Sequence, residues 1–338
     1  MRALIEQTLN MGHDSDIYPR LRRWLLALAL AILGAPVGAQ SMNGFDLKGA
    51  LIPIDEIHHG GPEKDGIPSI DKPDFLSAGF AAFLKVSDPV LGLAIGGDQR
   101  AYPLRIMNWH EVVNDRVGGQ PVVVTYCPLC GTGVAFDARI AGRELNFGVS
   151  GLLYNSDVLL YDRQTQSLWS QLLGQAISGP LKGTRLPMIA LTQTTWGDWR
   201  RQYPQTNVLS TSTGQARPYY RNPYDGYETS EELYFPVAFR SAGFHPKERV
   251  LGVTVGGQHK AYPFVELEKA VRRQGDVRSD LELRESLAGQ VVRIRFNTAA
   301  GRATAYDAQG KQLPAIVGYW FAWYAFHPET EIYRAAVK

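Results

Sequence analysis

The chain has 338 residues, 45% of them hydrophobic, and a formal net charge of +2 from 35 basic and 33 acidic residues. The charges are dispersed without the basic block that nucleic acid or an anionic lipid surface would require, so we expect neither partner. Because the chain holds only two cysteines, it is not a disulfide-stabilised scaffold.

The first 39 residues predict an export signal rather than part of the fold. Three arginines precede the apolar run 24–33, and small residues lead to a cleavage site near Ala39-Gln40. The apolar run is too short to span a membrane comfortably, and no later stretch is long enough. We therefore expect a periplasmic or secreted protein that has no stable membrane anchor after signal cleavage.

The sequence then repeats itself. The stretch 90–104, VLGLAIGGDQRAYPL, returns as 250–264, VLGVTVGGQHKAYPF. A second stretch, 119–138, aligns without a gap on 289–308. Each stretch reads as two strands joined by a turn, and the first pair of turns is built on Gly-Gly.

Helical spacing lies between the two strand pairs in each copy, at 106–114 and at 265–273. The sequence thus predicts an α+β, predominantly β fold with internally duplicated strand-strand-helix-strand-strand units. The expected organisation of the chain after the export signal is an N-terminal segment at 40–85, a first repeat with the cysteine site and an extension at 86–245, and a second repeat without cysteines at 246–338.

The run Tyr-Cys-Pro-Leu-Cys-Gly places Cys127 and Cys130 three residues apart, at the end of a predicted strand. Two thiols at this spacing can chelate one metal ion or close a small disulfide. Asn297 and Ala300 stand at the same places in the second copy, which keeps the following glycine. The loop therefore forms without thiols, and this favours a functional site over a structural staple.

A metal site needs further ligands besides the two thiolates. His110 is the first candidate because its predicted helix precedes the strand that delivers Cys127, and Met107 lies one turn earlier on the same face. A set of Met107, His110, Cys127 and Cys130 is soft and suits Cu(I), with zinc next. We expect one transition metal ion, copper or zinc, handled or delivered together with a metal-donor or metal-acceptor protein of the periplasm. A core histidine and plain packing of the methionine are the structural alternatives.

Two other functions remain open, one of them enzymatic. A thiol–disulfide oxidoreductase would cycle Cys127 and Cys130, but Gly131-Thr132-Gly133 makes the thiol-activating helix doubtful. A non-catalytic binding module would keep a structural disulfide and use the aromatic run 319–328 as its ligand surface. Such a run more often fills a core.

Several short motifs together resemble the uncharacterised DUF3179 family of bacterial and archaeal proteins. These motifs are Gly66-Ile67-Pro68 with Asp71, His110 to Asp115, Thr125 to Gly131, Phe147 to Gly151, Tyr161-Asp162-Arg163 with Leu168-Trp169, and Phe326 to Thr330. The resemblance implies no activity, but it marks the cysteine pair, His110, Asp162, Arg163 and His327 as positions of interest. From their closeness in sequence we expect an ion pair among Asp157, Asp162 and Arg163.

Overall fold

Runs of β-branched and apolar residues form most of the fold. In the central strand β8 (Gln120–Cys127), Val122, Val123 and Val124 are all buried, which is typical of a strand covered on both faces. The structure is a computed structural model that describes residues 41–275 and 280–336. The predicted export signal lies outside these described residues.

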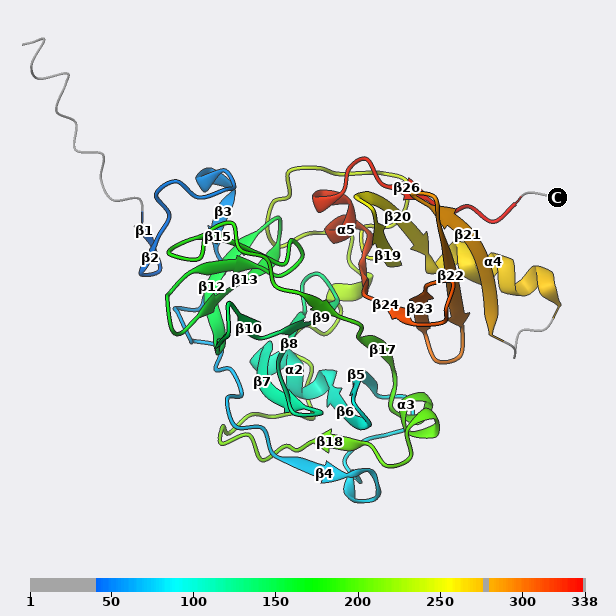
Figure 1. The fold of residues 1–338 in the computed structure, drawn as a ribbon, viewed down its shortest axis with the longest axis horizontal. Helices are drawn as coiled ribbons and strands as arrows, with labels where there is room; N and C mark the ends of the chain where they lie inside the picture. The colour runs from blue at the N-terminus through cyan, green and yellow to red at the C-terminus, as the bar shows by residue number, and fades with distance from the viewer. Residues whose placement is uncertain (1–40, 276–279, 337–338) are drawn as a thin grey trace, which may run out of the picture. The chain divides into compact units, whose positions relative to one another are not determined.

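Five sheets of four or five strands form the blades of a propeller-like ring (Figure 1). This confirms the predominantly β class. Blade 1 holds, in spatial order, β15 (Gln175–Ser178), β14 (Leu168–Ser170), β13 (Asp157–Asp162), β12 (Phe147–Tyr154) and β3 (Ile57–His59). Blade 2 holds β16 (Met188–Ile189), β9 (Thr132–Asp137), β8 and β7 (Val112–Val117). Blade 3 holds β17 (Thr192–Thr195), β5 (Pro89–Ile95), β6 (Asp98–Pro103), β18 (Asn207–Leu209) and β4 (Phe75–Ser77).

Blade 4 holds β25 (Ala315–Tyr319), β19 (Arg249–Val255), β20 (Gln258–Pro263) and β26 (Glu331–Ile332). Blade 5 holds β21 (Leu281–Leu287), β22 (Gln290–Asn297), β23 (Arg302–Tyr306) and β24 (Gln312–Leu313). Two short pairs lie outside the blades, β1 (Ser41–Met42) with β2 (Phe45–Asp46) and β10 (Arg139–Ile140) with β11 (Arg143–Glu144). The α-helices of the described residues are α2 (Leu104–His110), α3 (Trp196–Gln202), α4 (Phe264–Gln274) and α5 (Trp320–Phe326). Their 3₁₀ turns are η1 (Ile54–Glu56), η2 (Ala78–Phe80) and η3 (Tyr227–Thr229).

The repeated stretches have the same order of elements. β5, β6, α2, β7 and β8 follow one another in the first, and β19, β20, α4, β21 and β22 in the second. Both Gly-Gly turns have two positive φ angles, as the tight hairpins require. One further similarity was not predicted from the sequence. Helix α3 connects β17, which is antiparallel to β5, with β18, which is parallel to β6. Helix α5 in the same way connects β25, antiparallel to β19, with β26, parallel to β20.

The helix predicted over 106–114 ends earlier than its spacing indicated. α2 ends at His110, where Glu111 takes a left-handed conformation with φ 58°. The next residues, Val112 to Val117, pair with β8 instead. Tertiary pairing of these β-branched residues therefore overrides a short helical pattern. The second helix, α4, matches its predicted range 265–273 closely.

We call the elements from β5 to β18 (residues 89–209) the first unit and those from β19 to β26 (residues 249–332) the second unit. Each unit packs a tryptophan onto a glycine of its first strand. Trp199 of α3 lies on Gly92, and Trp323 of α5 lies on Gly252. A Cβ atom at either glycine would come within 2.2 or 2.1 Å of the indole ring. Each indole N–H also donates to a threonine hydroxyl seven residues later, at 2.9 Å. Only glycine permits this contact between helix and strand.

The aromatic run 319–328 belongs to the core. Trp320 is fully buried and Trp323 is 3% exposed. The expectation that the run fills the core is confirmed, and the binding-module alternative that needed an exposed aromatic surface is wrong.

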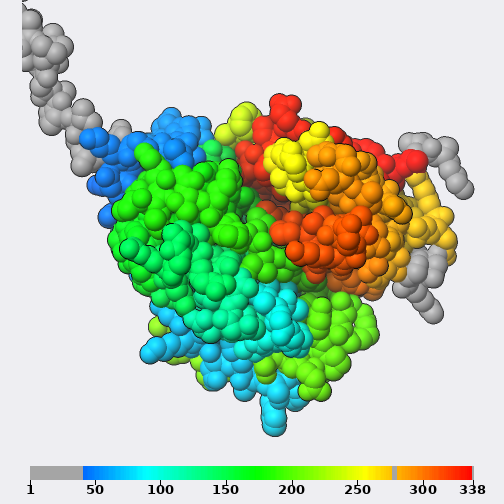
Figure 2. Space-filling model, in the orientation of Figure 1, coloured from blue at the N-terminus to red at the C-terminus, as the bar shows by residue number. Residues whose placement is uncertain are grey.

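A buried ion pair joins blade 3 to blade 5. Arg302 of β23 donates to Asp198 of α3 at 2.9 Å and to Asp280 at 2.8 Å. Strands β17 and β23 are in contact beside it. Figure 2 shows the orange surface of blade 5 against the green surface of an earlier part of the chain. The described residues form one compact body, and the predicted boundaries at 85/86 and 245/246 stay predictions.

No helix among the described residues has the length and apolar character needed to cross a membrane.

The substitution Gly92→Ala is expected to destabilise the protein by about 3 kcal/mol, because the added methyl group collides with the Trp199 ring. Gly79→Ala is the matched control, since its added methyl group meets no atom within 4 Å and the expected change is below about 0.5 kcal/mol. The free energy of unfolding in denaturant measures both. Equal effects at the two positions would contradict the packing argument.

Candidate metal centre

The cysteines lie in a tight turn between β8 and β9. Cys127 ends β8, Thr132 begins β9, and the two residues are register partners. Gly131 makes the turn possible with φ 63°, and a Cβ atom there would lie 3.0 Å from the ring of Tyr319. A strand, and no helix, follows the second cysteine, as the sequence indicated.

Both cysteines are free and buried, with exposed fractions of 1% for Cys127 and 0% for Cys130. The Cys130 carbonyl accepts a hydrogen bond from the Tyr319 N–H at 2.8 Å, so the turn is fixed to blade 4. The thiol of Cys130 donates to the Ser156 carbonyl at 3.3 Å. The thiols thus face the tip of another hairpin.

That hairpin joins β12 to β13 and delivers an aspartate to the cysteines. Its two-residue turn is Asn155-Ser156, with φ angles of 51° and 65°, the signs that a type I′ turn requires. Positive φ costs a serine about 1 kcal/mol, so neighbouring contacts must hold the turn. The Asn155 side chain accepts from the Ala238 N–H at 2.7 Å and donates to the Ala325 carbonyl at 3.4 Å.

Asp157 follows this turn and completes a group of three ligand-type side chains. One ligand atom each from Cys127, Cys130 and Asp157 lies within 4.8 Å of the other two, and all three residues are buried. Asp157 Oδ2 accepts from the Leu172 N–H at 3.1 Å. Oδ1, also buried, has no hydrogen-bond partner among the described residues. An orphaned buried oxygen beside two thiols fits the donor set of a metal ion.

The protonation of the group follows from its burial. Burial raises the pKa of the Cys127 thiol and raises that of Cys130 well above its usual value, with the neighbouring thiol as a further cause for Cys130. Burial also raises the pKa of Asp157 to about 7. Without a cation the two thiols therefore keep their protons at neutral pH, and a bound cation would stabilise the ionised ligands instead.

A second carboxyl lies on an apolar cavity beside the centre. Burial, followed by the Asp157 charge, raises the pKa of Glu111 to about 8. Glu111 lines a cavity of 260 Å³ together with Leu129 and Val158. Leu129 lies between the two cysteines in sequence, and Val158 follows Asp157. The cavity is therefore bordered by residues directly adjacent to the candidate ligands.

His110 is buried, but the structure does not bring it together with the cysteines. Its Nδ1 lies 2.7 Å from the Pro68 carbonyl, and its Nε2 lies 2.6 Å from the Tyr219 hydroxyl. Both ring nitrogens are thus engaged, and burial lowers the pKa of the ring. Met107 is fully buried in a separate apolar cluster around Leu91. Asp157 takes the place that the sequence analysis gave to these two residues.

The segment 210–248, between β18 and β19, packs over the centre. Tyr227 lies in the same apolar cluster as the two cysteines, and Phe235 packs against that cluster. His110 holds this segment through Tyr219, and Trp109 donates to the Arg221 carbonyl at 3.2 Å. His110 is therefore placed to fix this cover rather than to ligate an ion.

Asp162 and Arg163 also lie away from the cysteine group. Asp162 accepts an indole N–H at 2.9 Å, while Arg163 pairs with Asp65 at 3.1 Å and Asp71 at 3.5 Å. The expected ion pair among Asp157, Asp162 and Arg163 is wrong, because the arginine takes its carboxylate partners from the N-terminal segment.

His327 stacks on His259 with ring centroids 3.9 Å apart, and it packs against Trp323 at 4.2 Å. Burial, followed by the charge of His259, lowers the pKa of His327 to about 4. The structure places this histidine with blade 4 and not in the cysteine group.

The substitution Glu111→Gln is expected to flatten the pH dependence of stability in the metal-free protein. The unfolded carboxyl loses its proton near pH 4.5, but the folded one only near pH 8, so stability falls as the pH rises through this window. Glutamine removes that contribution, while Asp157 keeps its own in the variant. Denaturant unfolding at several pH values measures the difference, and parallel curves for the two proteins would contradict the assignment.

Comparison with known proteins places the chain in a family without assigning an activity. The model of the DUF3179 family, described as a protein of unknown function, matches residues 64–330. No curated protein and no solved structure matches the chain. The matched range holds all three side chains of the candidate centre and most of both units. The chain therefore belongs to the DUF3179 family.

Proposed function

We propose that this protein binds one transition metal ion through Cys127, Cys130 and Asp157. The single observation that carries the proposal is the buried Asp157 Oδ1, which lacks a hydrogen-bond partner among the described residues and shares a 4.8 Å group with two buried thiols. Two thiolates and a carboxylate would carry three negative charges at a buried position. A divalent cation would offset most of that charge.

The donor set favours zinc, with copper as the second choice. Zinc accepts sulfur and carboxylate oxygen together, whereas Cu(I) selects thiolate and thioether ligands. Copper would be the first choice if Met107 were a ligand, but that side chain lies in another apolar cluster. With an aspartate in its place, the set becomes harder and better suited to Zn²⁺.

The burial of the site supports a resident ion. Neither cysteine is more than 1% exposed, and the segment 210–248 packs over them. Release to a metal-accepting protein would require this segment to move. We therefore propose that the ion contributes to folding stability, and that residues 1–39 direct the chain to the periplasm or outside the cell. Delivery together with a metal-donor or metal-acceptor protein remains a prediction.

We also propose that the two units are a duplicated pair in which only the first carries the centre. The shared element order and the two tryptophan–glycine contacts support a duplication. In the second unit the Asn297 side chain accepts from the Ala300 N–H at 2.8 Å. An amide thus holds the turn where the first unit has thiols.

Thiol–disulfide exchange is the second candidate function. A buried carboxyl with a pKa of about 7 beside two thiols is a suitable proton acceptor for thiolate formation. Both thiols are buried, however, so the disulfide of a substrate protein could not reach them. In addition, the strand β9 begins where a helix that activates the thiol would have to begin. These two observations rank exchange below metal binding.

The metal proposal predicts about one zinc per chain in protein purified without chelator, measured by elemental mass spectrometry. Replacing both cysteines by serine should abolish this content, and Asp157→Asn should weaken zinc binding by about tenfold or more in a chelator competition. Asp162→Asn is the matched control, because this buried aspartate lies on the same hairpin but outside the group.

Unchanged zinc content in the double serine variant would overturn the proposal. Protein without metal, but with a Cys127–Cys130 disulfide that forms and is reduced reversibly, would transfer support to thiol–disulfide exchange.

A further inference from the structure

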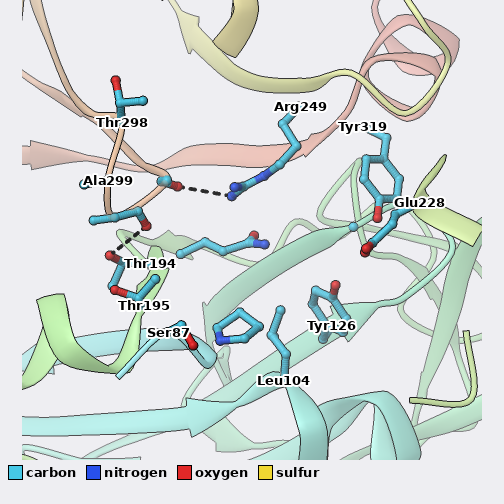
Figure 3. Close-up of a pocket in the computed structure, with 15 residues that line it drawn as sticks. Ser87, Leu104, Tyr126, Thr194, Thr195, Glu228, Arg249, Thr298, Ala299 and Tyr319 are labelled. Atoms are coloured by element: carbon cyan, nitrogen blue, oxygen red, sulfur yellow. Dashed lines mark hydrogen bonds between the residues drawn. The ribbon is translucent and has the colours of Figure 1, made fainter. Parts of the chain in front are cut away.

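A second cavity, of 430 Å³, lies between the matching turns of the two units (Figure 3). Gly131 lines it from the cysteine turn, and Thr298, Ala299, Ala300 and Gly301 line it from the equivalent turn of the second unit. Its volume is within the usual range of about 300–1,000 Å³ for small-molecule sites. The metal proposal leaves this cavity without a role.

Arg249 supplies the positive charge of this cavity. Its guanidinium donates one hydrogen bond within the described residues, to the Gly301 carbonyl at 3.3 Å, drawn as a dashed line in Figure 3. The guanidinium also lies over the Phe264 ring, 4.6 Å from its centroid. Arg249 forms no ion pair with a described carboxylate, with 4.0 Å as the limiting N–O distance, although its guanidinium has five N–H donors. It is therefore available to an anionic group.

Glu228 supplies the negative charge, together with two phenols. Figure 3 shows Glu228 beside Tyr319, on the side of the cavity away from Thr298. Tyr126 lines the same side. Burial raises the pKa of Tyr319, with the Glu228 charge as the next cause, and it raises that of Tyr126, where Glu228 contributes less. The carboxylate and the guanidinium form no ion pair with each other, although both line the cavity.

The rest of the lining adds one more unpaired polar group and an apolar floor. Gln193 Oε1 is buried without a hydrogen-bond partner in the described part of the chain. Pro89 and Leu104 contribute apolar surface. A ligand of this cavity therefore needs polar groups for the amide and the charges, and a small apolar part for the floor.

We propose that this cavity binds a small zwitterion of the amino-acid class, with its carboxylate on Arg249 and its ammonium group on Glu228. A simple anion would bind Arg249 but would be repelled by Glu228. A simple cation would likewise be repelled by Arg249. A molecule with both charges satisfies both residues at once. The proposal is independent of the metal centre.

Isothermal titration calorimetry with a graded series tests the class and the spacing of the charges. The probes are glycine, β-alanine, γ-aminobutyrate and 6-aminohexanoate, and the single-charge comparators are butyrate and butylamine. At least one zwitterion is expected to bind, and to bind about tenfold or more tightly than either comparator. If none of the four zwitterions binds, or if butyrate or butylamine binds as well as the best of them, the proposal fails.

Two charge-neutralising variants test the residue roles against the best probe. Arg249→Gln and Glu228→Gln should each weaken its binding by about tenfold or more. Glu228 is exposed, so its variant is expected to fold even if the Arg249 variant does not. Glu231→Gln, an exposed residue on the same segment, is the matched control. Unchanged affinity in the Glu228 variant would overturn the assignment.

Discussion

The contact on which the rest of the site depends is that of the β12–β13 hairpin tip with the cysteine turn. It brings a carboxyl and two thiols together in a buried region, where burial disfavours the charged form of all three. The positive φ angles of Asn155 and Ser156 show that this approach has a conformational cost. The Asn155 amide bonds to two distant backbone groups, and these offset that cost.

Several residues far from the cysteines in sequence stabilise this contact. His110 and its helix hold the segment 210–248, which in turn packs over the centre and donates a backbone N–H to Asn155. Tyr319 fixes the cysteine turn through the Cys130 carbonyl. The same tyrosine lines the cavity of Arg249, so one residue of blade 4 borders both sites. The two sites nevertheless use different chemistry, thiolate and carboxylate in one and opposite charges in the other.

Local patterns in the sequence predicted the elements well where pairing is local. The Gly-Gly hairpins, the helix α4 and the strand after Cys130 lie where the pattern put them. The pattern failed at 111–114, where strand pairing with β8 competes with helical spacing. The tryptophan–glycine contacts link positions more than 70 residues apart (Gly252 and Trp323), and no short-range pattern reports them.

The sequence by itself determined the family, the predominantly β class and the cysteine pair as the place to look. Only the tertiary structure decided that Asp157, and neither His110 nor Met107, lies with the thiols. The reason is that nearness along the chain suggests a ligand from the preceding helix, whereas the actual neighbour arrives on a hairpin of another blade. Burial, which sets the protonation of these groups, is likewise a property of the assembled blades and is invisible in the order of residues.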